Sequence, residues 1–435
     1  MEFLKAMKSC LRMGLFLFCG VSLLIACSGD ASGLSPSISP SPNPLPQVTA
    51  TYTPLSPLNQ NSRRGIQIWL PPQFDPDSDQ LANQYLRDRL QVFHEKFSNL
   101  PIEVRIKAEE GPGGMLDALL AASEAAPLAL PDLVLLPRKL VTPLAQSGIL
   151  HPLDGYFDLA EDQRWYPYAR QLVTVENTPF GIPFVGDVLL LAYPKALANE
   201  LPLDWNDWLV SRYTLGFAAA DPQATVMLAL YLQAGGAVRN AQGKPMLDET
   251  ILTEVLEKLS YANRQGKLPA WVIQAENDQL VSQSLAEGKI DSGYLWGSNF
   301  LKNDFREWRA SAGFLANKTS LTLANGWIWA STSPIPDQIG ISFQLATYLS
   351  EAEFMAAFTQ SGRYLPTRAD AYSYWQANEL TKDLDTISQL AQAIPPDSLS
   401  DPLGVALRNA VLAVIKDRIS PEQAAKDAVA NLSKP

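Results

Sequence analysis

The segment PDLVLLPRKLVTPLAQSGILHPL, at Pro131–Leu153, combines the two patterns that decide the fold class. Its first six residues indicate a strand that is buried on both faces of a sheet. The residues after them indicate a short helix that ends near Gly148. Upstream, the sequence GIQIWL at Gly65–Leu70 and the alternating apolar residues at 102–106 predict two further strands.

Helical patterns separate these predicted strands. Apolar residues recur at helical spacing between Leu81 and Phe97, and a Gly-Pro-Gly-Gly turn at 111–114 opens a second helix. No Gly-Lys-Ser/Thr follows this turn, so it is not a phosphate-binding loop. The alternation of strands and helices predicts an α/β fold with a parallel sheet covered by helices on both faces.

The same alternation returns in the second half of the chain. Strands are expected at Tyr213–Ala219 and Ile290–Leu295, and a long helix is expected after Asp248. Near the C-terminus, a capping box at 420–423 begins a last helix. A chain of 435 residues is too long for one ordinary core, and we therefore expect two or three domains.

The composition narrows the class of protein. Lys and Arg number 34 against 45 Asp and Glu, a net charge of −11, which argues against nucleic acid as a partner. The chain has two histidines, His94 and His151, and its three cysteines lie within the first 27 residues. This distribution excludes a Cys/His zinc site and a disulfide framework, and no metal or cofactor is expected.

The N-terminus reads as an export signal. Basic residues precede an apolar run at Met13–Ala26, which is too short to span a membrane as a helix. The run ends in Leu-Ile-Ala-Cys, which resembles the lipobox of bacterial lipoproteins, and this implies that Cys27 becomes a lipid-modified first residue. The alternative is a plain signal peptide with a chance cysteine. Residues 31–62 contain seven prolines, seven serines and no charged residue, which predicts a disordered spacer.

Several landmarks occur in an order that resembles family 1 extracellular solute-binding proteins. They are Pro131–Leu153 completed by Asp154, the Gly-Ile-Pro hinge strand in GIPFVGDVLLLAYPKAL at Gly181–Leu197, WNDWL within Leu203–Leu209, the glycine-punctuated region Gln233–Gly266, LAEGKIDSGYLWGS at Leu285–Ser298, GRYLPTR at Gly362–Arg368, and the last helix at Ser420–Leu432. The seven landmarks occur in this order across most of the chain.

The resemblance implies a two-lobed periplasmic-binding-protein fold, similar to class II, in which a hinged cleft separates two α/β lobes. It places a signal peptide at 1–26, a lipidated cysteine and spacer at 27–62, one lobe at 63–184 plus 313–350, and the other at 185–312 plus 351–435. The expected protein is an extracytoplasmic, lipid-anchored monomer. It would close on a small solute, most often a sugar or oligosaccharide, and deliver it to an ABC transporter permease.

Sugar sites pair flat aromatic rings with carboxylates or amides, and candidates follow from that chemistry and from the resemblance. Trp296 follows a predicted strand where the family often has a stacking aromatic residue, and a core position is the alternative. Asp187 lies just past the hinge, where a carboxylate often accepts bonds from hydroxyl groups; a capping role is its alternative. Trp327 shares a strand face with Trp329, so at least one of the two belongs to the core. The full set of candidates is Trp296, Asp187, Trp327, Asn299, Tyr364, Arg363 and Trp69.

One segment departs from the maltose-binding relative of the family. The stretch Leu135–Leu144 would contribute an aromatic residue and a carboxylate there, whereas this chain has Leu-Pro-Arg-Lys at 136–139. The resemblance therefore does not imply specificity for maltodextrins, and Arg138 or Lys139 could instead pair with an acidic ligand. An exposed Arg-Lys pair is the plainer alternative.

Two other functions compete with transport. The same binder could report a non-sugar ligand to a membrane sensor, and the sequence does not separate the two roles. A secreted glycosidase would need two carboxylates about 5–10 Å apart. No Gly-x-Ser-x-Gly or His-Glu-x-x-His motif is present, so we expect a protein that is not an enzyme.

Overall fold

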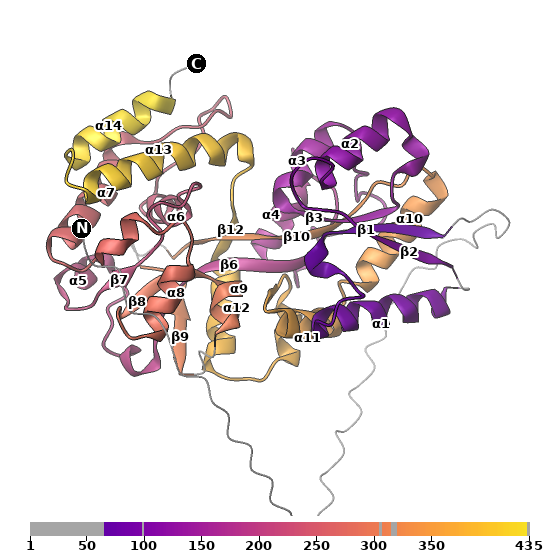
Figure 1. The fold of residues 1–435 in the computed structure, drawn as a ribbon, viewed down its shortest axis with the longest axis horizontal. Coiled ribbons are helices and arrows are strands. Elements are labelled where there is room, and N and C mark those ends of the chain that lie inside the picture. The colour runs from indigo at the N-terminus through magenta and orange to yellow at the C-terminus, as the bar shows by residue number, and fades with distance from the viewer. Residues whose placement is uncertain (1–64, 98–99, 304–306, 315–319, 433–435) are drawn as a thin grey trace, which may run out of the picture. The chain divides into compact units, whose positions relative to one another are not determined.

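The computed structural model describes residues 65–97, 100–303, 307–314 and 320–432 (Figure 1). The predicted signal peptide, Cys27 and the spacer lie outside the described residues. Most other predicted elements appear near their expected positions. The strands are β1 (Ile66–Leu70), β2 (Ile102–Ile106), β3 (Leu133–Pro137), β4 (Thr174–Val175), β5 (Thr178–Pro179), β6 (Ile182–Pro194), β7 (Leu215–Gly216), β8 (Ser292–Trp296), β9 (Trp308–Ser311), β10 (Thr322–Ser331), β11 (Leu365–Pro366) and β12 (Ala391–Ala393).

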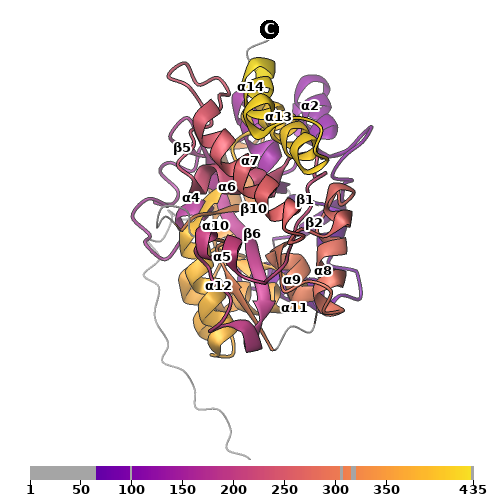
Figure 2. The same ribbon diagram turned by 90° about the vertical axis from the view of Figure 1, so that its left-hand side faces the viewer.

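Strands β4 and β5 form a small separate sheet, and helices pack on both sides of the main sheet that the other strands form. They are α1 (Leu81–Lys96), α2 (Met115–Ala125), α3 (Arg138–Gln146), α4 (Pro167–Val173), α5 (Trp205–Val210), α6 (Thr225–Gln233), α7 (Glu249–Arg264), α8 (Gln279–Ala286), α9 (Gly297–Lys302), α10 (Pro336–Tyr348), α11 (Ala352–Gly362), α12 (Glu379–Leu390), α13 (Asp397–Ile415) and α14 (Pro421–Leu432). Figures 1 and 2 show α7, α13 and α14 together on one side of β6, with α12 on the other.

The main sheet has the strand order β2-β1-β3-β10-β6-β8-β7. Its two ends are parallel, as predicted: β1 pairs in parallel with β2 and β3, and β7 pairs in parallel with β8. The middle is antiparallel, because β10 runs against both β3 and β6. The strand expected at Tyr213–Ala219 is reduced to the two residues of β7, which pair with Ser292 and Gly293 of β8.

Two long strands, β6 and β10, connect the two ends of the sheet (Figure 1). Side chains along β6 alternate between two buried cores: Val188, Leu190 and Ala192 belong to the first core, and Leu189, Leu191 and Tyr193 belong to the second core. Leu323 and Ala324 of β10 divide between the two cores in the same way. Successive side chains of a strand point to opposite faces of the sheet, so the two faces of this part of β6 and β10 border different cores.

The packing of helix α11 differs from its predicted lobe assignment. The prediction assigns residues from 351 onward to the second lobe, but α11 packs against α1 of the first. The cause is aromatic packing: Phe358 lies 6.0 Å from the ring of Phe74 and 4.8 Å from that of Phe184. The other lobe boundaries stay a prediction.

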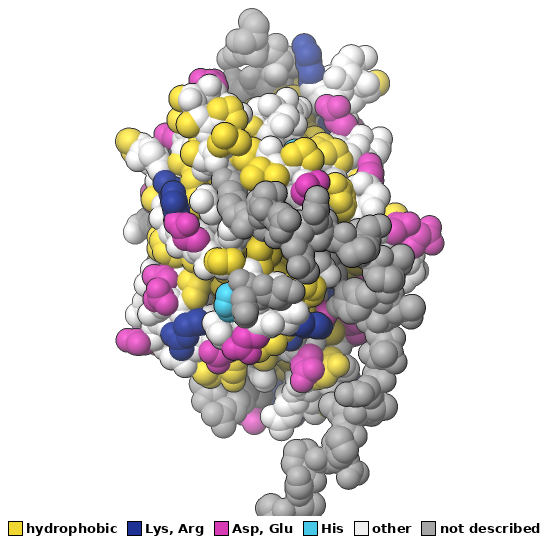
Figure 3. Space-filling model, turned by 90° about the vertical axis from the view of Figure 1, so that its right-hand side faces the viewer, with side chains coloured by type: hydrophobic (Ala, Val, Ile, Leu, Met, Phe, Trp, Pro, Cys, Tyr) yellow, Lys and Arg dark blue, Asp and Glu magenta, His cyan; other side chains and the backbone are white. Residues whose placement is uncertain are grey.

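Helix α13 is long and apolar enough to cross a membrane by length and composition alone. More than half of that stretch is buried inside the protein, where α13 packs against α6, α7 and α14. It is therefore a core helix of the second half. On the face shown in Figure 3, acidic and basic side chains are interspersed where grey atoms do not cover them. That part of the surface has no concentrated basic patch.

Candidate functional site

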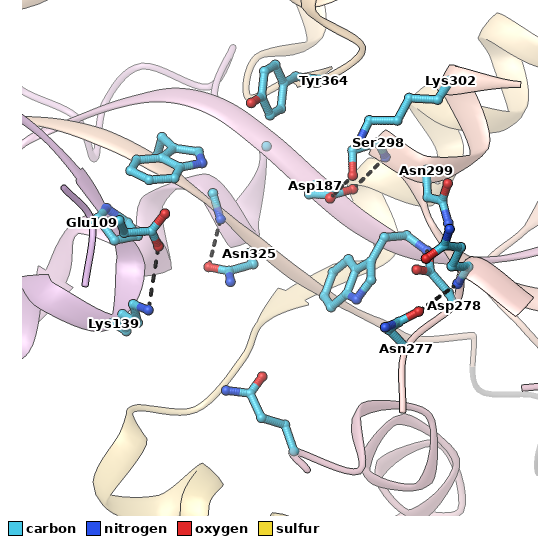
Figure 4. Close-up of a pocket in the computed structure, with 17 residues that line it drawn as sticks. Glu109, Lys139, Asp187, Asn277, Asp278, Ser298, Asn299, Lys302, Asn325 and Tyr364 are labelled. Atoms are coloured by element: carbon cyan, nitrogen blue, oxygen red, sulfur yellow. Dashed lines mark hydrogen bonds and ion pairs between the residues drawn. The ribbon is translucent and has the colours of Figure 1, made fainter. Parts of the chain in front are cut away.

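A cavity of about 730 Å³ lies beside the two connecting strands, and its lining comes from both ends of the sheet (Figure 4). Gly186 of β6 and Gly326 of β10 are part of the lining. The aromatic lining residues are Trp296, Trp327 and Tyr364. The polar and charged lining residues are Glu109, Lys139, Asp187, Gln223, Asn277, Asp278, Gln279, Ser298, Asn299, Lys302 and Asn325.

Five of the seven candidate residues line this cavity: Trp296, Asp187, Trp327, Asn299 and Tyr364. They come from segments up to 177 residues apart, between 187 and 364 in the sequence. The fold thus gathers most of the predicted set at one place. Contact with a ligand stays a prediction.

Trp296 is the last residue of β8 and the residue before α9. Its side chain is partly exposed and packs at the edge of the second core. Its backbone N–H donates a hydrogen bond of 2.8 Å to Oδ2 of Asp278. A half-buried indole at a cavity wall offers a flat apolar surface to a ligand without first having to leave the core.

Trp327 and Trp329 take the two roles that the sequence left open. Trp329 is fully buried, with its ring 5.2 Å from that of Phe184. Trp327 is partly exposed and lines the cavity, next to an irregularity in the pairing of β10 with β6. Phe74 supports the second aromatic wall, because it meets Trp327 edge-on at 5.0 Å and stacks on Tyr364 at 5.7 Å.

Asp187 lies on β6 and already accepts two hydrogen bonds from Ser298. The backbone N–H of Ser298 donates to Oδ1 at 2.8 Å and its hydroxyl donates to Oδ2 at 2.5 Å (Figure 4). The capping role that the sequence left open is therefore real. Burial raises the pKa of Asp187 to about 6; the bonds from Ser298 and the charge of Lys302 oppose this rise, and Asp278 adds to it. Each carboxylate oxygen keeps a second lone pair for another donor.

This raised pKa gives a pH prediction for Asp187→Asn. The ordinary value is 3.8, so the folded chain holds this proton more tightly than the unfolded chain does. The resulting stabilisation is complete below about pH 4 and is lost as the pH rises through about 6. Asparagine stays neutral, and the variant should be more stable than the wild type at pH 7.5 by at most about 2 kcal/mol, because water in the cavity screens the charge.

Urea unfolding of both proteins between pH 4 and pH 7.5 measures this difference. The stability gap should open between pH 4 and pH 6 and stay constant above pH 7. A gap that is the same at every pH would contradict the proposed titration of Asp187. Asp204→Asn serves as a control, because Asp204 caps α5 through exposed hydrogen bonds away from the cavity.

Two candidates lie outside the cavity lining. Trp69 is only 4% exposed and belongs to the first core, and the ammonium group of Lys107 lies 4.5 Å from its ring. Arg363 is exposed and ends α11 with a φ of 62°, and its backbone N–H donates to the carbonyl of Thr359. Arg363 therefore serves as a helix-ending residue in the left-handed region.

Charged residues outside the set of seven candidates also line the cavity. Lys139 forms an ion pair with Glu109 at 3.5 Å and another with Glu110, and Glu109 and Lys139 both line the cavity (Figure 4). Arg138 is instead buried and donates to Oγ1 of Thr142 at 3.1 Å. Of the two basic residues that could pair with an acidic ligand, Lys139 lines the cavity and Arg138 does not.

The amide-bearing residues have a weak sequence signal. Asn277 and Asp278 directly precede α8, Gln279 is the first residue of α8, and Gln223 lies two residues before α6. Polar residues at the starts of helices usually act as caps, so this pattern alone does not distinguish a binding residue. Within the described ranges, no group of three or more His, Cys, Asp or Glu side chains could hold a metal ion.

Two connecting strands beside a cavity with aromatic and amide walls define a ligand-binding α/β protein. The chain belongs to the bacterial extracellular solute-binding protein family, whose model matches residues 89–385. This confirms the resemblance in the sequence and assigns the protein to an extracytoplasmic location.

Solved structures confirm the predicted two-lobed fold class. The sugar-binding protein MalE from Xanthomonas citri is 16% identical, with a TM-score of 0.70 over 85% of this chain and 96% of that chain. The cyclic α-maltosyl-1,6-maltose-binding protein from Arthrobacter globiformis is 14% identical, with a TM-score of 0.69 over 85% of this chain and 98% of that chain.

One curated relative is similar in sequence. The maltotriose-binding protein of Pyrococcus abyssi (strain GE5 / Orsay) is 26% identical over 123 residues, which is 28% of this chain. The match covers 26% of the relative, so the chain spans about a quarter of the length of the curated relative that it matches.

Proposed function

We propose that the protein captures a neutral sugar or oligosaccharide outside the cytoplasm and delivers it, chemically unchanged, to an ABC transporter permease. The cavity carries this proposal. Trp296 and Trp327 offer flat apolar surfaces, and amides and carboxylates surround them. Sugars have apolar ring faces and hydroxyl edges, which match that combination. Relatives that bind maltose and maltotriose by name support the same class of ligand.

The balance of charges at the cavity favours a neutral ligand over an acidic one. Glu109, Asp187 and Asp278 line it together with the two cations Lys139 and Lys302. Lys139 is already paired with Glu109 and Glu110. A carboxylate on the ligand would therefore meet more negative than positive charge, which disfavours its binding.

The capture mechanism that we propose is closure of two lobes around the ligand. The proposed lobes are 63–184 plus 313–350 and 185–312 plus 351–435, except that α11 (Ala352–Gly362), which packs against α1, belongs to the first lobe. The lining residues come from both ends of the sheet that β6 and β10 connect. A ligand can contact residues from both ends at once only when these ends are close together, so closure completes the binding site. We also propose that lipid on Cys27 tethers the protein, with 27–62 as a spacer.

A thermal-shift screen tests the proposed function. The full chain, purified in detergent, is heated with maltose, maltotriose, glucuronic acid or buffer alone. A neutral sugar at a hundredfold excess over its Kd should stabilise the folded state by about 2.7 kcal/mol, and the Tm should rise by a few degrees. The absence of a shift with every neutral sugar would contradict the proposal. Release of glucose from a bound sugar would make the protein an enzyme and would also contradict it.

A further inference from the structure

The turn at Trp296–Ser298 is held at both ends by carboxylates from distant segments. Asp278 accepts the backbone N–H of Trp296 at 2.8 Å, and Asp187 accepts the backbone N–H of Ser298 at 2.8 Å. Asp278 is 18 residues before Trp296, and Asp187 is 111 residues before Ser298. Hydrogen bonds from a backbone N–H to an ionised carboxylate are roughly twice as strong as those to a neutral acceptor.

Asp278 is in the position of a helix cap but does not cap its own helix. It is the residue before α8, where a carboxylate usually accepts a backbone N–H from the first turn. Its side chain makes no such bond, and its Oδ2 accepts the N–H of Trp296 instead. The carboxylate therefore stabilises the cavity wall rather than α8.

The middle of the turn is tightly packed. A Cβ atom on Gly297 would come within 2.8 Å of Cδ1 of Leu365 and 3.3 Å of Oδ1 of Asp187. A side chain at this position would require Leu365 or the turn itself to shift. The turn is therefore fixed by packing in its middle and by carboxylates at its ends.

We propose that Asp278 and Asp187 are positioning residues that fix the indole of Trp296 at the cavity wall. Asp278 holds the backbone N–H of Trp296 at the start of the turn, and Asp187 holds the backbone N–H of Ser298 at its end. The ring then needs little ordering when a ligand arrives, which increases affinity. The effect on affinity rests on the proposed function, whereas the effect on the ring does not.

Fluorine NMR of the full chain labelled with 5-fluorotryptophan tests, in the absence of a ligand, whether the two carboxylates fix the indole ring of Trp296. Trp296→Phe identifies the resonance of Trp296 by its disappearance. In Asp278→Ala, this resonance should move and broaden. In Asp278→Asn, it should stay near the wild-type position, because the amide oxygen still accepts the N–H. An unchanged Trp296 resonance in Asp278→Ala would overturn the proposal.

A matched control separates positioning from general loss of stability. Asp204→Ala removes another carboxylate that accepts a backbone N–H at 2.8 Å, from Asn206 at the start of α5, and Asp204 is not in the cavity lining. It should leave the Trp296 resonance unchanged. If Asp278→Ala does not fold, Asp187→Ala removes the acceptor of the backbone N–H of Ser298 at the other end of the turn and should broaden the same resonance. An unchanged resonance there would overturn the proposal.

Titration with maltotriose adds the second measurement. Asp278→Ala should weaken binding about tenfold, which is about 1.4 kcal/mol, while Asp278→Asn should stay within about threefold of the wild type. A wild type that binds no sugar, together with the expected fluorine shifts, would refute the proposed function and support the positioning role. Normal sugar binding by Asp278→Ala would refute the positioning role and leave the function intact.

Discussion

Trp296→Ala should weaken the binding of maltotriose about 100-fold. The indole would bury a large flat area against a sugar ring, and an aromatic side chain of this size contributes about 2–3 kcal/mol to binding. Each 1.4 kcal/mol corresponds to about a tenfold change in Kd. Isothermal titration calorimetry at pH 7.5, below and above the wild-type Kd, measures the loss.

The stability of the ligand-free protein should change much less. Trp296 is partly exposed and touches only the edge of the second core, so its loss should cost about 1–2 kcal/mol. Trp375→Ala is the matched control, because Trp375 is also partly exposed but is not in the cavity lining. Equal losses of affinity in both variants, or unfolding of Trp296→Ala, would show that Trp296 is a structural residue.

The local parts of the fold could be predicted from the sequence, and the connections between them could not. Strands β1, β2 and β3 and the helices between them follow from hydrophobic periodicity within a few residues. The antiparallel position of β10 between β3 and β6 depends on pairing across more than a hundred residues. No local pattern encodes such a partner, so the sheet order came only from the structure.

In the candidate site, too, some residues could be predicted from the sequence and others could not. Trp296 and Asp187 could be predicted as lining residues because the resemblance to the family marks their places beside recognisable strands. Trp69 also lies on a strand, but its side chain is buried in the first core, and the sequence pattern does not show this. Glu109 and Asn277 belong to loops that the fold brings to the same cavity from 168 residues apart in the sequence.

Gly186→Ala should destabilise the protein by about 3 kcal/mol, near the upper end for overpacking in a core. Gly186 lies on β6 between Gly326 of β10 and Leu365 of β11. A Cβ atom here would overlap the hydroxyl of Tyr168 and approach its Cζ to 3.0 Å. Tyr168 is fully buried, and its hydroxyl donates to the carbonyl of Pro366 at 3.3 Å, so the ring cannot move aside.

A double-mutant cycle with Tyr168→Phe tests this cause. Tyr168→Phe alone should cost about 1 kcal/mol, because the carbonyl of Pro366 loses its donor. It also removes the atom that the new Cβ overlaps, so the double variant should recover about 1–2 kcal/mol relative to the sum of the single changes. Urea unfolding of the four proteins gives the coupling, and a coupling near zero would show that the glycine is needed for another reason.

Gly340→Ala is the control for this cycle. Gly340 lies within α10, and its Cβ would reach Tyr156 only at an ordinary contact distance of 3.4 Å. Alanine there should be neutral or stabilise the helix by up to about 1 kcal/mol. If alanine lowers the free energy of unfolding at Gly186 but not at Gly340, the loss at Gly186 comes from close packing on β6 and not from the replacement of a glycine as such. Because Gly186 also lines the cavity beside Asp187, Gly186→Ala should weaken sugar binding as well, whereas Gly340→Ala should leave it unchanged.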